Sequence, residues 1–518
     1  MLPRDQGVSS AIDVLVDCNG AAVRDPRHSR PSLYDRAGHW MPIALTAGFA
    51  LIGIVMFGSL ADAIGRHLTS VPSHAGAAEK GGLVCLRPCP CNRRQFLMRI
   101  LLTEGSGLTS RQVAGRLGAL GHQVEILSST ALCLTRFTRH VRAVHAVPRF
   151  GLDPFGWLDA AERIVGERRV DLLFPTQEQV TILSALESRL KLRTIVPPFA
   201  ALMRVQDKIS AFRALSEIGA PQPETMVIAS ANDLSRMKNF PAFVKRPVST
   251  ASSGVRRVKT PEELADAAHA FGLGAGELIV QTQANGQLAM VQAVAQRGRL
   301  VAQHACLRLR EGVGGGAALK ESVTLPEIPV LLAKLVAALD WHGGLSMDVI
   351  VSDDGPKIID VNPRLVEPAN ALAAGVDLVG AMLDIAGARH APEQPAGRPG
   401  VRTHQALIAI LGAAEQSGKR RAVLCETLNA IFSRGAYVGS AEELTPLSGD
   451  PVAAVPLALA LAATLTYPPL WRKFHAGAVG PYAVTPEAWQ RILEAGKSQE
   501  ALFAASNANG SSTGEARS

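Results

Sequence analysis

The sequence predicts a parallel α/β unit, then an α+β unit, and finally a mostly helical C-terminal region. From Met98 onward, apolar strand-like runs alternate with segments of helical periodicity, which is the pattern of a doubly wound parallel sheet. After about Thr225 the pattern changes to short strands arranged as hairpins. A Pro/Gly-rich stretch at Arg389–Gly400 then precedes the helical remainder and indicates a boundary.

Length and composition are those of a globular protein with more than one domain. The chain has 518 residues, 47% hydrophobic and 19% charged, which is too long for one ordinary domain. Its net charge of +8 is diffuse. This charge suits an anionic small substrate, and without a basic stripe it does not indicate nucleic acid. Seven cysteines give no disulfide framework, which favours a reducing, cytoplasmic setting for the catalytic part.

Residues 1–97 form a distinct N-terminal segment. Within it, Trp40–Ala61 runs 22 residues without a charge, long enough to span a bilayer. The run begins too far from the terminus for an ordinary signal peptide, and no small-residue cleavage site follows it. Two interpretations stay open. The segment 40–61 is either a single membrane anchor, or part of an extension that is not made, with Met98 as the true start.

Residues 98–205 are predicted to form a Rossmann-like domain. The apolar strand in "RILLTEGSG" leads into a Gly-rich turn, and the following segment has helical periodicity. The strands "HQVEIL" and "RVDLLFPTQEQ" come next, and the second ends in a polar loop. Gly105 and Gly107 lack the third glycine of the dinucleotide fingerprint. We therefore interpret them as a tight turn that lines a substrate cleft.

The next predicted domain covers residues 206–390. Its expected helices include Pro326–Trp341 and one continuous helix over Ala369–Gly387. Residues 391–505 are expected to be mostly helical. The uncharged run Pro451–Trp471 is interrupted by prolines and predicts a buried or interfacial helix. The tail 506–518, rich in Ser, Gly and Asn, is expected to be disordered.

A hairpin in "LSMDVIVSDDGPKIIDVN" places two carboxylates opposite each other. A turn centred on Asp354 pairs Asp348 with Asp360, and Asn362 lies on the same face. The other face is predicted to be apolar: Val349, Val351, Ile359 and Val361. Opposed carboxylates repel unless a cation lies between them, and hard oxygen ligands suit Mg²⁺. The alternative is a solvent-exposed strand pair whose acids stay hydrated.

Upstream, Lys245 lies at the end of a strand and precedes a loop of small residues. Backbone N–H groups of such a loop can approach phosphates, and a lysine adds a positive charge. The loop residues concerned are Ser252, Ser253 and Gly254. An ordinary hairpin loop is the alternative. "ELIVQTQANGQ" follows and is predicted to be an edge strand whose main chain could read an adenine.

These motifs, in this order, resemble the ATP-grasp superfamily. They are Asp207-Lys208 with its helix and "GAPQPET", Lys245 with its loop, "ELIVQTQANGQ", Asp348 and "DVNPR". The likeness covers about Arg99–Gly387. It is closest to the ATP-binding halves of carbamoyl-phosphate synthase large subunits and to carboxylate–amine ligases. It therefore implies a Rossmann-like pre-ATP-grasp domain followed by an ATP-grasp fold.

The resemblance also implies roles for individual residues. Lys208 and Lys245 would hold the phosphates of ATP, and Arg364 would face the acyl phosphate. The metal ligands for Mg²⁺, with Mn²⁺ as the other candidate ion, would be Asp348, Asp360 and Asn362. The remaining ATP contacts would be Ser252, Ser253, Gly254, Gln281, Gln283 and Gln287. Arg310 joins the catalytic set because "RLREGVGGGAALKES" resembles a phosphate- and substrate-facing segment.

The sequence departs from the pattern of this family at several positions. The family commonly has Glu where this chain has Gln281, Gln287 and Asp360, and its loop is usually richer in Gly. Asp360 can still bind a metal, whereas Gln287 weakens the expected ribose contact.

The expected function is an ATP-dependent carboxylate–amine ligase. Mg-ATP would convert a carboxylate into an acyl phosphate, and an amine would capture it, so the expected partners are small molecules. Two alternatives stay open: a carbamoyl-phosphate-type phosphotransferase, and an ATP-binding sensor without catalysis.

Overall fold

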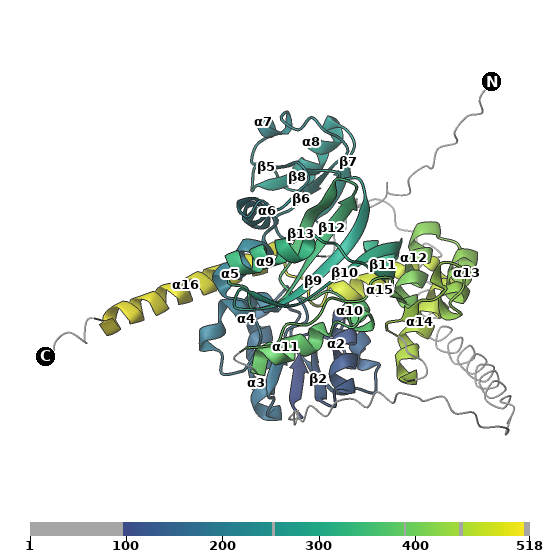
Figure 1. The fold of residues 1–518 in the computed structure, drawn as a ribbon, viewed down its shortest axis with the longest axis horizontal. Helices are drawn as coiled ribbons and strands as arrows, with labels where there is room; N and C mark the ends of the chain where they lie inside the picture. The colour runs from purple at the N-terminus through teal and green to yellow at the C-terminus, as the bar shows by residue number, and fades with distance from the viewer. Residues whose placement is uncertain (1–96, 251–253, 388–389, 445–448, 512–518) are drawn as a thin grey trace, which may run out of the picture. The chain divides into compact units, whose positions relative to one another are not determined.

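Three β-sheets organise the described part of the chain in a computed structural model (Figure 1). The structure describes residues 97–511 apart from 251–253, 388–389 and 445–448. These residues belong to one compact unit that begins at Phe96. The predicted apolar segment 40–61 lies outside them. Among the described residues, no helix combines the length and apolar character that crossing a membrane requires.

The first sheet is parallel and has the order β3-β2-β1-β4. Its strands are β1 (Arg99–Leu102), β2 (Gln123–Ser128), β3 (Val141–Ala146) and β4 (Leu172–Phe174), with helices α2 (Leu108–Ala119) and α3 (Pro154–Arg168) between them. Ile100, Leu101 and Leu102 of β1 are fully buried. The chain goes from β1 to β2 on one side and later reaches β4 on the other. A ligand crevice is therefore expected at the carboxyl ends of β1 and β4.

A small antiparallel sheet lies next in the chain, at the top of Figure 1, in the order β5-β8-β6-β7. Its elements are β5 (Thr225–Ile228), β6 (Ala242–Lys245), β7 (Val255–Val258), β8 (Leu278–Thr282) and the helices α7 (Ala231–Leu234) and α8 (Pro261–Ala270). The predicted hairpin of β6 and β7 is present. The prediction that β8 is an edge strand is wrong, because β5 and β6 pair with its two sides.

The large sheet has seven strands in the order β13-β12-β9-β10-β11-β14-β15. They are β9 (Gln287–Gln296), β10 (Arg299–Glu311), β11 (Ala317–Ser322), β12 (Gly343–Ser352), β13 (Gly355–Asn362), β14 (Arg402–His404) and β15 (Ala441–Glu442). Helix α9 (Ile328–Ala338) buries Leu332 and Leu335 against this sheet in one apolar core. A second core joins β9 and β10 to residues of the parallel sheet.

The single helix predicted over Ala369–Gly387 is two helices, α10 (Ala369–Ala374) and α11 (Leu378–Gly387). Gly375 ends α10 with φ of 101°, a left-handed conformation that glycine adopts without strain. The Asp377 carboxylate then accepts a hydrogen bond from Gly380 N at 2.9 Å and stabilises the start of α11.

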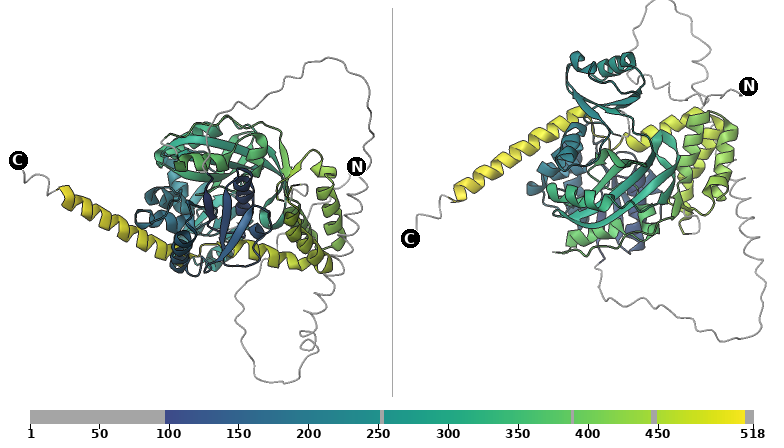
Figure 2. Two further views of the ribbon diagram at one scale, coloured as in Figure 1. Left: turned by 90° about the horizontal axis from the view of Figure 1, so that it is seen from below. Right: turned by 45° about the horizontal axis from the view of Figure 1, so that its top comes forward.

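The C-terminal region is mostly helical, as predicted, and its helices group beside the β11–β15 end of the large sheet (Figure 2). They are α12 (Ala406–Ser417), α13 (Arg420–Ile431), α14 (Ala454–Thr466) and α15 (Trp471–Val479), followed by α16 (Pro486–Ser511). Helix α14 buries Leu457 and Leu461, which fits the predicted buried helix. The start of α16 packs on the parallel sheet unit through Trp489 and Ile492. Because α16 continues to Ser511, residues 506–511 are helical instead of disordered.

Candidate active site

The predicted pairing of Asp348 with Asp360 is present in the β12–β13 hairpin, although the register near the turn differs. Ser352 pairs with Gly355 across a two-residue turn, so pairs near the turn are shifted by one. A β-bulge at Ile359 restores the predicted register at the two aspartates. As a result Ile358, and not Ile359, joins the apolar core.

The bulge gives the Ile359 carbonyl a partner from the small sheet. Lys245 Nζ donates to Ile359 O at 2.8 Å and to Gln281 Oε1 at 2.8 Å. Lys245 ends β6, and Gln281 lies on the adjacent strand β8, where it pairs with Phe243. Nearby, Lys208 Nζ lies 3.4 Å from Asp360 Oδ1. Lys208 and Lys245 therefore lie close enough to the two aspartates of the large sheet to interact with them electrostatically.

Burial perturbs the pKa values of this group in opposite directions. Burial lowers the pKa of Lys245 from 10.5 to about 8, and the charge of Lys208 adds to the effect, while Asp360 and Asp348 oppose it. Burial and the Asp360 charge raise the pKa of Asp348 to about 6. Each of these charges is thus destabilised within the protein and would gain from a ligand of opposite charge.

The carboxylates and Asn362 fit the ligand set of a hard cation such as Mg²⁺. Asn362 follows Asp360 by two residues on β13 and pairs with Ser346. No group of three or more His, Cys, Asp or Glu suited to metal binding occurs in the described ranges. The predicted set instead has two carboxylates and one amide, and Mg²⁺ usually completes its coordination with phosphate oxygens and water.

The other predicted nucleotide contacts are partly used within the fold. Gln281 donates to Thr225 Oγ1 at 3.0 Å and is 5% exposed. Gln283 accepts from Arg257 Nε at 2.7 Å, and the exposed Gln287 donates to Arg308 O at 3.4 Å. Gly254 is described and its carbonyl accepts from Arg246 N. Ser252 and Ser253 lie outside the described residues, so their role stays a prediction.

Arg364 connects the hairpin with the carboxyl ends of the parallel sheet. Its Nε and Nη2 donate to Glu178 Oε1 at 3.3 and 3.2 Å, and Glu178 lies in the loop after β4. Glu104, in the loop after β1, accepts from Ser106 N and from Gly107 N. Burial raises the pKa of Glu104 to about 7. The structure therefore places Arg364 at the carboxyl end of β4, where the strand order predicts a ligand crevice.

Arg310 does not join this group. Its Nε and Nη2 donate to the two carboxylate oxygens of Glu426, both at 2.7 Å, and its guanidinium lies over Tyr437 of the C-terminal region. The arginine of β10 whose charge acts on Asp348 is Arg308. The two bulges between β10 and β11 at this point change which side chains share a face. We therefore remove Arg310 from the candidate site.

A buried ionic cluster beside the crevice escaped the sequence analysis. Lys320 Nζ bonds to Glu367 Oε2 at 2.6 Å and to Glu443 Oε2 at 2.8 Å, and its side chain is fully buried. Gln405 donates to Glu367, and Gln112 donates to Glu443. A lysine directly after the apolar residues Ala317–Leu319 of this strand was the available signal for Lys320. The sequence held no comparable signal for Glu443.

Comparison with known proteins locates the similarity. No curated protein matches the chain. Among solved structures, the biotin carboxylase domain of 2-oxoglutarate carboxylase from Hydrogenobacter thermophilus, in complex with Mg-ADP and bicarbonate, has a TM-score of 0.49 and 18% identity, covering 60% of this chain and 74% of that chain. The L-amino acid ligase of Bacillus licheniformis has a TM-score of 0.45 and 16% identity, over 55% and 73%.

The N5-carboxyaminoimidazole ribonucleotide synthetase of Thermus thermophilus has a TM-score of 0.45 and 21% identity, covering 59% of this chain and 81% of that chain. Since these TM-scores are below 0.5, we base no argument on them. The family model of the ATP-grasp domain, in contrast, matches residues 205–368, which include Lys208, Lys245, Asp348, Asp360 and Arg364. The chain therefore contains an ATP-grasp domain, and the resemblance inferred from the sequence is confirmed.

Proposed function

We propose that this protein is an ATP-dependent ligase that converts a carboxylate into an acyl phosphate and then joins the acyl group to an amine. The observation that supports this most is the meeting of Lys208 and Lys245 with Asp348 and Asp360. Anionic phosphates and a divalent cation together satisfy both kinds of charge.

The lysines are proposed to bind the phosphates of ATP. Two of the three N–H donors of Lys245 are engaged by Ile359 O and Gln281 Oε1, which leaves one for a phosphate oxygen. Lys208 follows the N-cap Asp207 of α6 (Lys208–Glu217), so its position is fixed at the start of a helix. Asp348, Asp360 and Asn362 would hold Mg²⁺ or Mn²⁺, which would neutralise phosphate charge.

Arg364 is proposed to bind the carboxylate substrate. Its contacts with Glu178 are at the long end for charge-assisted hydrogen bonds, at 3.3 and 3.2 Å. A guanidinium held this way can pair with an incoming carboxylate while Glu178 keeps its orientation. The oxygen of that carboxylate would attack the γ-phosphorus and release ADP.

The crevice beside Arg364 contains acceptors that favour an amine as the second substrate. Among the buried side-chain oxygens without a partner in the described part of the chain are Glu104 Oε1, Gln177 Oε1 and Gln179 Oε1. They belong to the loops after β1 and β4. Buried acceptors without donors are costly, and an N–H-rich ligand would satisfy them.

Glu104 has the properties of a general base for this amine. Its pKa of about 7 allows the carboxylate to accept a proton near neutral pH. In the proposed step the amine nitrogen bonds to the acyl carbon, phosphate leaves, and Glu104 takes the proton that the nitrogen loses. The unpartnered acceptors and this base both suit an amine substrate. They therefore favour the ligase over a phosphotransferase that stops at the mixed anhydride.

A hydroxylamine assay tests this proposal and separates its alternatives. Purified protein is incubated with Mg-ATP and a panel of carboxylates, with and without amines, and ADP and products are measured by mass spectrometry. Hydroxylamine traps an acyl phosphate as a hydroxamate. Amide formation supports the ligase. An acyl phosphate or hydroxamate with no amide from any amine would support the phosphotransferase, and ATP binding without stimulated turnover would support the sensor.

The Glu104→Gln variant tests the amine step separately. We expect amide formation to fall at least tenfold while hydroxamate formation stays within about twofold, because hydroxylamine is already neutral near pH 7. Glu167→Gln, on the exposed surface of α3, is the matched control. Equal loss of both products would contradict the role of Glu104 as the base.

A further inference from the structure

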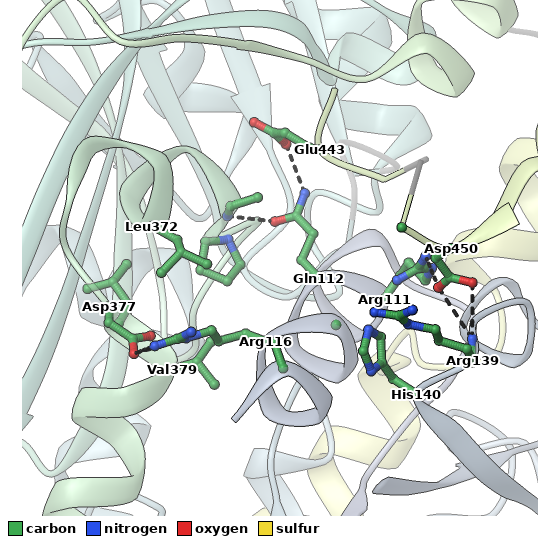
Figure 3. Close-up of a pocket in the computed structure, with 16 residues that line it drawn as sticks. Arg111, Gln112, Arg116, Arg139, His140, Leu372, Asp377, Val379, Glu443 and Asp450 are labelled. Atoms are coloured by element: carbon green, nitrogen blue, oxygen red, sulfur yellow. Dashed lines mark hydrogen bonds and ion pairs between the residues drawn. The ribbon is translucent and has the colours of Figure 1, made fainter. Parts of the chain in front are cut away.

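A cavity outside the proposed active site lies along helix α2 (Figure 3). Its volume is ≈ 270 Å³, and its walls come from α2, the 139–140 segment, α10, the start of α11 and residues 449–450. One side carries Arg111, Arg139 and His140, and the opposite side carries Arg116 with Asp377 (Figure 3). Gln112 and Glu443 also line it, and Glu443 connects it with the buried Lys320.

The arginines on the two sides differ in how fully the protein pairs them. Arg116 is held by Asp377, since its Nε and Nη2 donate to Oδ2 at 3.0 and 2.6 Å. Arg111 is 5% exposed, yet the one hydrogen bond that its guanidinium makes within the described ranges is from Nη2 to Asp450, at 3.3 Å. Burial lowers the pKa of Arg111 in spite of the charges of Asp450 and Glu442. Arg111 is therefore a buried cation with unused donors.

A second guanidinium lies on the same side of the cavity. Arg139 is exposed, and only its backbone N–H contacts Asp450, at 3.1 and 3.3 Å. No bond to its guanidinium occurs among the residues that the structure describes. Burial lowers the pKa of His140, and the charges of Arg139 and Arg111 add to this effect while Asp450 opposes it. The two guanidinium groups of this side face one carboxylate, that of Asp450, which leaves an excess of one positive charge.

We propose that this cavity is a second ligand site that binds a small oxyanion, a carboxylate or a phosphate, through Arg111 and Arg139. Guanidinium groups recognise both anions by paired N–H donors. The rest of the lining includes Leu372, Leu378 and Val379, so the ligand has room for a short apolar body. Arg116 contributes little, because Asp377 already neutralises it.

Calorimetric titration of the full-length protein with sodium phosphate and, separately, with sodium butyrate tests this site and distinguishes the two anions. Ionic strength is held constant with NaCl. We expect saturable binding of at least one probe and at least tenfold weaker binding in Arg139→Gln. Arg142→Gln, an exposed arginine of β3 outside the cavity, should bind like the wild type. Loss in Lys208→Gln without loss in Arg139→Gln would place the anion on the proposed ATP lysines and overturn the proposal.

A cavity-filling variant gives an independent test. Gly115 lines the cavity within α2, and a Cβ there would meet only Arg111 Nη1, at 3.5 Å. Gly115→Leu should therefore fill the cavity, abolish binding and leave the melting temperature equal or higher, since leucine favours helix over glycine. Gly166→Ala in α3, where a Cβ meets nothing within 4 Å, controls for helix propensity. No saturable binding of either probe to the wild type, or unchanged affinity in Gly115→Leu, would refute the second site.

Discussion

Replacing Gln281 by Glu should change the pH range in which the protein binds ADP. Gln281 Oε1 accepts from Lys245 Nζ at 2.8 Å. Because this amide is neutral, it does not offset the effect of burial, which lowers the pKa of Lys245 to about 8. An opposite charge at such a distance typically shifts a pKa by about 1–3 units, or about 1.4–4 kcal/mol. The variant should therefore raise the pKa of Lys245 to about 9–11.

The size of the effect on binding follows from the charged fraction of Lys245. With a pKa of about 8, roughly nine tenths of the Lys245 side chains are charged at pH 7 and roughly one tenth at pH 9. The affinity for ADP should fall by up to about tenfold over this range in the wild type. In Gln281→Glu, with a pKa near 9.5, the same change should be less than about 1.5-fold.

Calorimetric titration with ADP and Mg²⁺ from pH 7 to pH 9.5 measures this difference. Gln416→Glu adds the same charge at an exposed position of α12 that does not contact Lys245 and serves as the matched control. The reasoning also has a consequence for stability. Because the unfolded chain keeps a proton that folded Lys245 has lost, the free energy of unfolding of the wild type should rise from pH 8 to pH 10.5. A flat affinity profile in the wild type, or equal shifts in both variants, would refute the reasoning.

Four further outcomes are expected. Asp360→Asn should abolish Mg²⁺-dependent ADP formation with an unchanged circular dichroism spectrum, and wild-type turnover would contradict the metal assignment. Because the pKa of Asp348 is raised to about 6, protons should compete with Mg²⁺ below that pH. Calorimetry should then show Mg-ADP binding that weakens by up to about tenfold per pH unit, and Asp348→Asn should lack this dependence. Lys320→Met leaves two buried carboxylates unpaired and should cost about 3–5 kcal/mol in urea unfolding, whereas the exposed Lys334→Met should cost little. Arg310→Gln should keep ADP formation within about twofold, since its partners lie in the C-terminal region, and a tenfold loss would return it to the site.

The pairing of Asp348 with Asp360 could be predicted from the sequence because short-range rules decide it. Alternation along the strands placed Asp348 and Asp360 on one face, and a tight hairpin brought them together. The bulge at Ile359 could not be predicted, because it depends on how β13 meets Lys245 from another sheet. Because of the bulge, Asp348 pairs with Asp360 as predicted, but Ile358 lies in the core instead of Ile359.

The crevice could be predicted only in part, because long-range packing assembles it. The polar loop around Glu178 and the turn after Glu104 were visible in the sequence, and the strand order explains why such loops meet. Their contacts with Arg364 depend on how the parallel sheet unit packs on the large sheet. The partners of Lys320 come from residues 47 and 123 positions away, and no local pattern indicates them.

The position of these residues relative to the ATP-grasp match has a consequence for specificity. Lys208, Lys245, Asp348, Asp360 and Arg364 all lie within residues 205–368. The residues proposed to bind the amine lie outside that range. Glu104 and Glu178 precede it, and the later parts of the chain supply Glu443 and the buried Tyr482, whose ring lies beside Gly107 and whose pKa burial raises. In the proposed function, nucleotide binding and choice of amine would thus be carried by different parts of the sequence. Substitutions at Glu104 or Tyr482 should therefore change the preferred amine while leaving ADP affinity unchanged, and a parallel loss of ADP binding would show that the two halves are not separable.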